Sequence, residues 1–121
     1  MRVVPRGLLY VVVALMGLDA ATTYIIVASG SGREVNPMLQ FVNEAPHAIF
    51  FVYIFMTLAL AALLDAAEFL AAKLPSALGA RIRRIYTALF AAAAACRAAA
   101  VANNVMGIVF GTTPLADALY A

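Results

Sequence analysis

Three long runs of apolar residues, separated by short polar segments, dominate the pattern along the chain. They cover residues about 7–28, 46–72 and 82–110. Each run is long enough for a helix that crosses a hydrocarbon core of about 30 Å, at a rise of about 1.5 Å per residue. The pattern therefore predicts an all-α integral membrane protein with three transmembrane helices. We expect residues 1–121 to form a single domain.

The polar segments contain signals for further helix ends. Asn36 followed by Pro37 is typical of a helix N-cap with proline in the first turn, so we expect a short interfacial helix after the first span. By the same reasoning, Asn43 is expected to cap the second span. Thr113 is expected to cap a short surface helix over residues 114–120.

Composition supports the membrane assignment. Apolar residues make up 66% of the chain and charged residues 12%, and a soluble domain of 121 residues has too much surface to bury so many apolar side chains. The net charge is only +2, and the basic residues are clustered, so we expect no binding to nucleic acid. Cys96 is the single cysteine and cannot form an internal disulfide.

The basic residues predict how the chain lies across the membrane. Most of them precede the first span or lie between the second and third: Arg2, Arg6, Lys73, Arg81, Arg83 and Arg84. Arg33 alone lies between the first and second spans. Because cytoplasmic loops are enriched in Lys and Arg, we expect a multi-pass protein of the cell membrane with its N-terminus in the cytoplasm. With three spans, the C-terminus then lies outside.

Two residues of opposite charge lie inside the predicted spans. Asp19 lies 13 residues after Arg6 in the first span. Arg97 lies 13 residues after Arg84 in the third span. Both spans start at the predicted cytoplasmic face, so each charge lies about 20 Å above its basic neighbour, at a similar depth. Since a lone charge near the bilayer centre costs about 3 kcal/mol, we expect Asp19 and Arg97 to form an ion pair.

Further polar side chains are expected to gather around this pair. Thr22 and Thr23 follow Asp19 at the spacing that shares a helix face. The predicted cluster, which opens outward, comprises Asp19, Thr22, Thr23, Glu34, Asn36, Tyr53, Arg97, Asn103 and Asn104. Two interpretations stay open: the cluster binds or conducts a solute, or its hydrogen bonds lock the three helices together.

Several of these motifs, in order, resemble a family of short prokaryotic multi-pass membrane proteins defined as a domain of unknown function. The resemblance covers residues of about 7–110. The matching positions are Asp19, Thr23, Glu34, Asn36, Pro37 and Asn104. Some members of that family carry a Lys in the second span, where this chain has Val52-Tyr53-Ile54, so the role of the second span stays open. The resemblance implies a site but no activity.

Three classes of function follow from the sequence. The first is a component that binds or transports an ion or small solute. Because three helices cannot enclose a wide pore, transport would need a homo-oligomer or a larger membrane complex. The second is an accessory or scaffold subunit in which the cluster is purely structural. The third, an intramembrane enzyme acting on lipid, is the least favoured, because the chain has no familiar catalytic pair and no metal-spaced ligands. We therefore predict no catalytic residue, metal or cofactor.

Overall fold

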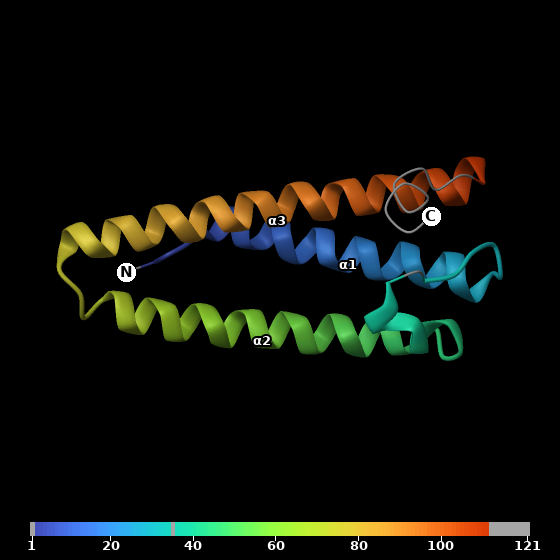
Figure 1. Cartoon of the computed structure of the whole chain (residues 1–121), viewed down its shortest axis with the longest axis horizontal. Coiled ribbons are helices and arrows are strands. Elements are labelled where there is room, and N and C mark those ends of the chain that lie inside the picture. Colours follow the sequence, from blue (N-terminus) through green and yellow to red (C-terminus); the bar gives the residue numbers. More distant parts are fainter. Residues whose placement is uncertain (1, 35, 112–121) are drawn as a thin grey trace.

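Three long helices lie side by side in the computed structural model, which describes residues 2–34 and 36–111 (Figure 1). The elements are α1 (Arg6–Ala28), the 3₁₀ helix η1 (Pro37–Asn43), α2 (Ala48–Ala71) and α3 (Ser76–Phe110). The described residues contain no strand. Each of the three long helices is long and apolar enough to cross a membrane. The predicted all-α fold with three candidate spans is therefore confirmed.

α3 begins before the predicted span. That span covers residues about 82–110, whereas the helix that contains it begins at Ser76, directly after Pro75. Arginine is a good helix former and continues the helix beyond the apolar run. At 35 residues, α3 is about 50 Å long and extends beyond a hydrocarbon core of about 30 Å.

The helices do not pack equally on one another. α1 lies between the other two and packs more extensively against α3 than against α2, while α2 and α3 scarcely touch (Figure 1). At the end of the bundle near the α2–α3 turn, the N-terminal residues Val3 and Val4 are fully buried in a cluster that includes Leu64 and Phe90. This packing of the N-terminal segment adds to the predicted fold.

An ion pair joins α1 to α2 near the same end. Arg6 Nη2 lies 3.4 Å from Glu68 Oε2. Glu68 is half-buried, and its Oε1 has no hydrogen-bond partner within the described residues. The sequence analysis uses Arg6 to predict orientation and depth in the membrane, and this contact with Glu68 adds a packing role.

At the opposite end, the segment between α1 and α2 folds back against both helices. Asn36 accepts a hydrogen bond from Met38 N at 3.1 Å, and Pro37 opens η1, which confirms the predicted cap and short helix. Val42 of η1 is fully buried beside Ala20 and Ile49. These apolar contacts hold η1 against α1 and α2.

Two predicted caps had different outcomes. Asn43 does not cap α2: the residue before that helix is His47, whose side chain makes no capping hydrogen bond. The Asn43 side chain instead bonds the backbone of Glu34, as described below. The surface helix predicted over residues 114–120, with Thr113 as its cap, lies outside the described residues.

The outer faces of the helices are apolar. Phe51, Phe55 and Leu58 of α2 and Leu89 and Phe110 of α3 are all well exposed. Exposed apolar surface on this scale is unfavourable in water, and hydrocarbon tails would cover it. The exposure pattern therefore agrees with helices that face lipid.

Candidate functional site

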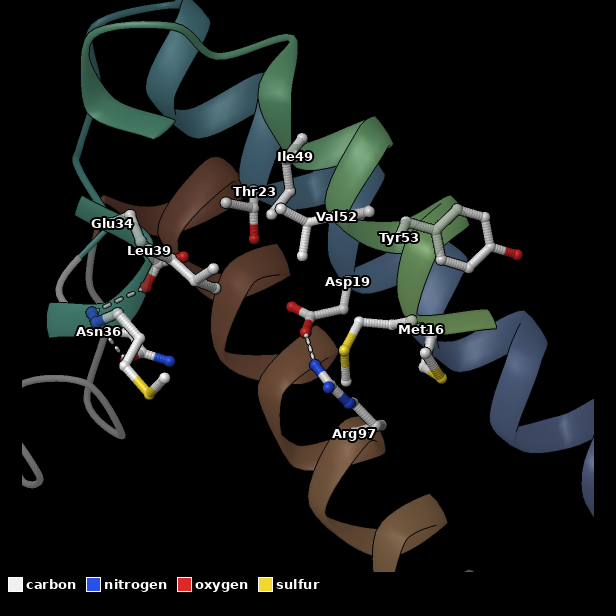
Figure 2. Close-up of a pocket in the computed structure, with 13 residues that line it drawn as sticks. Met16, Asp19, Thr23, Glu34, Asn36, Leu39, Ile49, Val52, Tyr53 and Arg97 are labelled. Carbon is white, nitrogen blue, oxygen red and sulfur yellow. Dashed lines mark hydrogen bonds and ion pairs between the residues drawn. The ribbon is translucent and has the colours of Figure 1, made fainter. Parts of the chain in front are cut away.

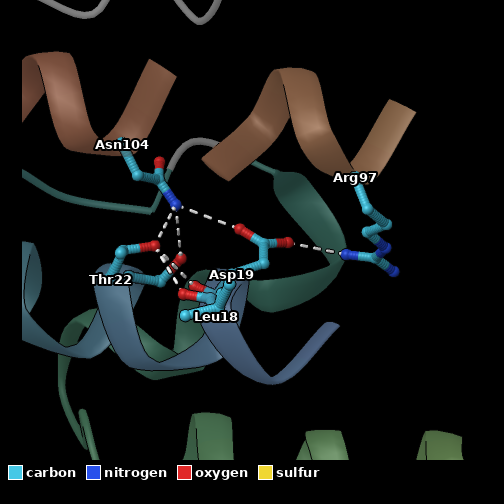
Figure 3. Close-up of polar contacts among 6 residues, drawn as sticks. Leu18, Asp19, Thr22, Arg97 and Asn104 are labelled. Carbon is cyan, nitrogen blue, oxygen red and sulfur yellow. Dashed lines mark hydrogen bonds and ion pairs between the residues drawn. The ribbon is translucent and has the colours of Figure 1, made fainter. Parts of the chain in front are cut away.

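The predicted contact between α1 and α3 is present. Arg97 Nη1 donates to Asp19 Oδ2 at 2.7 Å, a short distance typical of a charge-assisted hydrogen bond (Figure 3). The Asp19 side chain is 18% exposed and the Arg97 side chain 41%. The Asp19 side chain is thus largely enclosed by protein, while the Arg97 side chain is less enclosed.

Asn104 of α3 holds the other oxygen of the carboxylate. Its Nδ2 donates to Asp19 Oδ1 at 3.0 Å, and it lies 2.9 Å from Thr22 Oγ1 and 3.2 Å from Thr23 Oγ1 (Figure 3). An amide nitrogen carries two hydrogens, so these three acceptors share two donors. Both oxygens of Asp19 are therefore bonded from α3, one by a charged donor and one by a neutral donor.

The threonines complete this network in different ways. The Thr22 hydroxyl donates back to Leu18 O at 2.8 Å, so its oxygen is left to accept from Asn104. Thr23 is buried and contributes its oxygen to the same amide. Asn103, the next residue of α3, is also buried, but it does not line the cavity described next.

A half-open cavity of about 250 Å³ lies beside the ion pair (Figure 2). α1, α2, α3 and the segment that contains η1 all contribute to its lining. The polar lining residues are Asp19, Thr23, Glu34, Asn36, Tyr53 and Arg97. The apolar ones are Met16, Ala20, Met38, Leu39, Ile49, Val52 and Met56. The structure thus brings six of the nine predicted residues to one cavity. Asn104 does not line the cavity but bonds both Asp19 and Thr22.

Glu34 is positioned by a residue whose role the sequence analysis did not predict. Glu34 N donates to Asn43 Oδ1 at 2.6 Å, and Asn43 Nδ2 donates to Glu34 O at 3.0 Å. The side chain of Asn43 therefore pairs with both backbone groups of Glu34, as a neighbouring strand would. The Glu34 carboxylate in turn accepts from Asn36 N at 2.9 Å. The known tendency of asparagine to bond nearby backbone in loops was the signal for this role.

Tyr53 lines the cavity, but its hydroxyl does not join the polar cluster. The hydroxyl donates to Val13 O at 3.4 Å and points away from Asp19 (Figure 2). Gly17 explains this direction, because a Cβ at that position would lie 3.2 Å from the Tyr53 hydroxyl oxygen. The tyrosine ring thus uses the space left by glycine. Tyr53 lines the cavity as predicted, but its hydroxyl bonds the backbone of α1 and not the side chains of the cluster.

The chemistry available at this site is that of charge and hydrogen bonding. Within the described residues, no group of three or more His, Cys, Asp or Glu side chains could hold a metal ion. His47 packs edge-on against the Tyr24 ring, with centroids 5.6 Å apart. Cys96 is exposed on α3. The arrangement therefore offers carboxylates, a guanidinium and apolar walls to a ligand.

Comparisons with known proteins add no family to this description. No family model, no curated protein and no solved structure matches the chain. The resemblance to a domain family stays a prediction, and function is inferred from the geometry.

Proposed function

We propose that this membrane protein binds a small solute in the cavity beside Asp19 and Arg97. Binding would be part of an uptake, efflux or sensing step. One observation carries this proposal: charged groups at the predicted membrane depth border a half-open cavity of about 250 Å³. Ionisable residues within membrane segments mark ligand or ion sites by default, because burying them without a function is costly.

The partial exposure of the Arg97 side chain supports binding over a purely structural role. A pair that served only to lock helices would be expected to have packed side chains on every side. Arg97 instead keeps 41% of its side chain exposed and contributes to the cavity lining. Asp19 is held by two donors from α3, so the site is ordered before any ligand arrives. Such preorganisation lowers the cost of binding.

A cavity-filling substitution tests the proposal. Ala20 is buried and lines the cavity, so Ala20→Leu would occupy part of the space. Ala59→Leu, on an exposed position of α2, is the matched control. Ions and small solutes that raise the thermal unfolding midpoint of the detergent-solubilised wild-type protein are expected to lose this effect in Ala20→Leu but to keep it in the control. A solute that stabilises both variants equally binds elsewhere, and a screen in which none stabilises the wild type contradicts the proposal.

For the orientation, we infer that the N-terminus and the α2–α3 turn lie in the cytoplasm. They occupy the same end of the bundle and carry most of the basic residues (Figure 1). η1 and the cavity then belong to the outer half. In a Cys96→Ala background, Ser31→Cys is expected to react with an impermeant maleimide in intact cells, and Ser76→Cys only after permeabilisation. The reverse labelling pattern would show that the N-terminus and the α2–α3 turn lie outside the cell.

A second candidate is an accessory subunit of a larger membrane complex or homo-oligomer. The observation that favours it is the exposed face of α3, which presents small side chains, including Ala91, Ala95, Ala98 and Ala102. Small residues let membrane helices approach closely. Native mass spectrometry of protein extracted from its own membrane distinguishes the candidates: a stoichiometric partner or a defined oligomer is expected for a subunit, and a monomer argues against it.

A further inference from the structure

The charges that border the cavity do not balance. Asp19 is matched by Arg97 at 2.7 Å. Glu34 also lines the cavity, but no basic side chain among the described residues pairs with it. The Oε1 atom of Glu34 accepts a hydrogen bond from Asn36 N. Among the residues that the structure describes, no hydrogen bond reaches Glu34 Oε2. The lining therefore carries an excess of negative charge at Glu34.

The remainder of the lining is apolar and has room for more than a bare ion. Met16, Ala20, Leu39, Ile49, Val52 and Met56 form most of the wall. Apolar cavities of about 150 Å³ accept benzene, and this one is about 250 Å³. A ligand with an apolar body of about ten non-hydrogen atoms therefore fits the space, and the walls would gain by covering it.

Two other classes of ligand fit less well. Calcium and magnesium ions need about six or more oxygen ligands, and the described residues offer no acidic cluster that could supply them. An anion would compete with Asp19 for Arg97 and would lie near the carboxylate of Glu34. A cation fits better, because it can pair with Glu34 without displacing another charged group.

We infer that the ligand is an organic monocation with an apolar body, whose ammonium group pairs with Glu34 while its body lies against the methionine and aliphatic walls. This inference rests on the proposed function, since it concerns the same cavity. It assigns separate roles to the two acidic residues: Asp19 orders the site through Arg97, and Glu34 provides the charge that attracts the ligand.

Four aromatic probes of similar size test the inference on the full chain in lipid nanodiscs. They are benzyltrimethylammonium as the cation, benzyl alcohol as the neutral compound, benzoate as the anion and phenylalanine as the zwitterion. Calorimetric titration is expected to show that the cation binds at least tenfold more tightly than each of the other three. Tighter binding of benzoate or phenylalanine would overturn the inference.

Glu34→Gln tests the role of the charge. The amide oxygen of glutamine can still accept from Asn36 N, so the loop is expected to keep its fold, which an unchanged thermal unfolding midpoint would verify. Glu44→Gln removes a charge from an exposed residue that does not line the cavity, and is the matched control. We expect Glu34→Gln to weaken binding of benzyltrimethylammonium at least tenfold and Glu44→Gln to leave it unchanged. Equal binding by wild type and Glu34→Gln would overturn the inference.

Failure of the inference can be separated from failure of the proposed function by the cavity-filling variant. If benzoate, phenylalanine or benzyl alcohol binds preferentially and Ala20→Leu abolishes that binding, the cavity is a binding site but the charge assignment is wrong. If none of the four probes binds at a concentration of about 10 mM, the assignment to an organic cation also fails. The proposed function is then judged by the wider screen alone.

Discussion

Arg97 and Asp19 are 78 residues apart in the chain, yet Arg97 Nη1 lies 2.7 Å from Asp19 Oδ2 and ties α3 to α1. α1 and α3 also share the most extensive contact in the bundle. The ion pair therefore lies within the principal helix interface, where loss of either partner would leave the other charge without its match.

The first prediction concerns this pair. We expect Asp19→Asn to lower the free energy of unfolding by about 2 to 3 kcal/mol, because Arg97 would remain as an unmatched charge. Arg97→Leu should have an effect of similar size through Asp19. Combining the two substitutions should recover part of the loss, because no charge then lacks a partner. The measurement is thermal or denaturant unfolding in detergent.

An exposed acidic residue provides the control for this cycle. Asp65 of α2 is exposed, so Asp65→Asn should leave stability nearly unchanged. If the double variant lost as much stability as the two single variants added together, Asp19 and Arg97 would not be energetically coupled, and the distance between them would have no consequence for folding.

The second prediction concerns Asn104, which links Asp19 to both threonines. We expect Asn104→Ala to lower stability by about 1 to 2 kcal/mol, because a hydrogen bond between membrane helices contributes about 0.6 kcal/mol and several are lost together. Asn104→Asp should lower it further, since a second carboxylate would face Asp19. Val105→Ala, at the next and exposed position, is the control. If Asn104→Ala and Asn104→Asp were equally stable, repulsion between the new carboxylate and Asp19 would not contribute to stability.

Much of the fold and part of the site could be predicted because they depend on local signals and on membrane depth. The ends of α1 and α2 lie within two residues of the predicted bounds, close to glycine and proline residues that interrupt helices. The contact of Asp19 with Arg97 followed from counting residues from basic positions at one membrane face. Depth is a strong constraint in a bilayer, because few other partners exist at the same level.

The features that could not be predicted depend on how segments meet in three dimensions. α3 begins at Ser76, before the predicted span, because the bounds of that span were set by apolar residues, whereas arginine also continues a helix. The direction of the Tyr53 hydroxyl depends on the close approach of α2 to Gly17. The pairing of Asn43 with the Glu34 backbone depends on the return of η1 toward α1. No periodicity in the sequence encodes these relationships.

The third prediction concerns Asn43, which holds Glu34 at the cavity. Asn43→Asp keeps an oxygen for Glu34 N but loses the amide that donates to Glu34 O. We expect this change to weaken solute binding more than it lowers the unfolding midpoint, because the loop moves while the helices remain packed. The measurement is the affinity for benzyltrimethylammonium beside the unfolding midpoint, with Glu44→Gln as the neighbouring control. A variant that keeps full affinity would show that Asn43 does not position the carboxylate.

The last prediction concerns Gly17 and Gly7, two glycines of α1 with different surroundings. A Cβ at Gly17 would lie 3.2 Å from the hydroxyl oxygen and 3.3 Å from Cζ of Tyr53, whereas a Cβ at Gly7 would meet nothing within 4 Å. Alanine is favoured over glycine by up to about 1 kcal/mol in a helix, so Gly7→Ala should stabilise slightly. Gly17→Ala should instead destabilise by about 1 kcal/mol, because the ring must move, and Gly17→Leu should destabilise more strongly. Unfolding midpoints of the three variants check this order. If Gly17→Ala stabilised the protein as much as Gly7→Ala, the Tyr53 ring would be free to shift, and α1 and α2 would not be held at their observed separation by this contact.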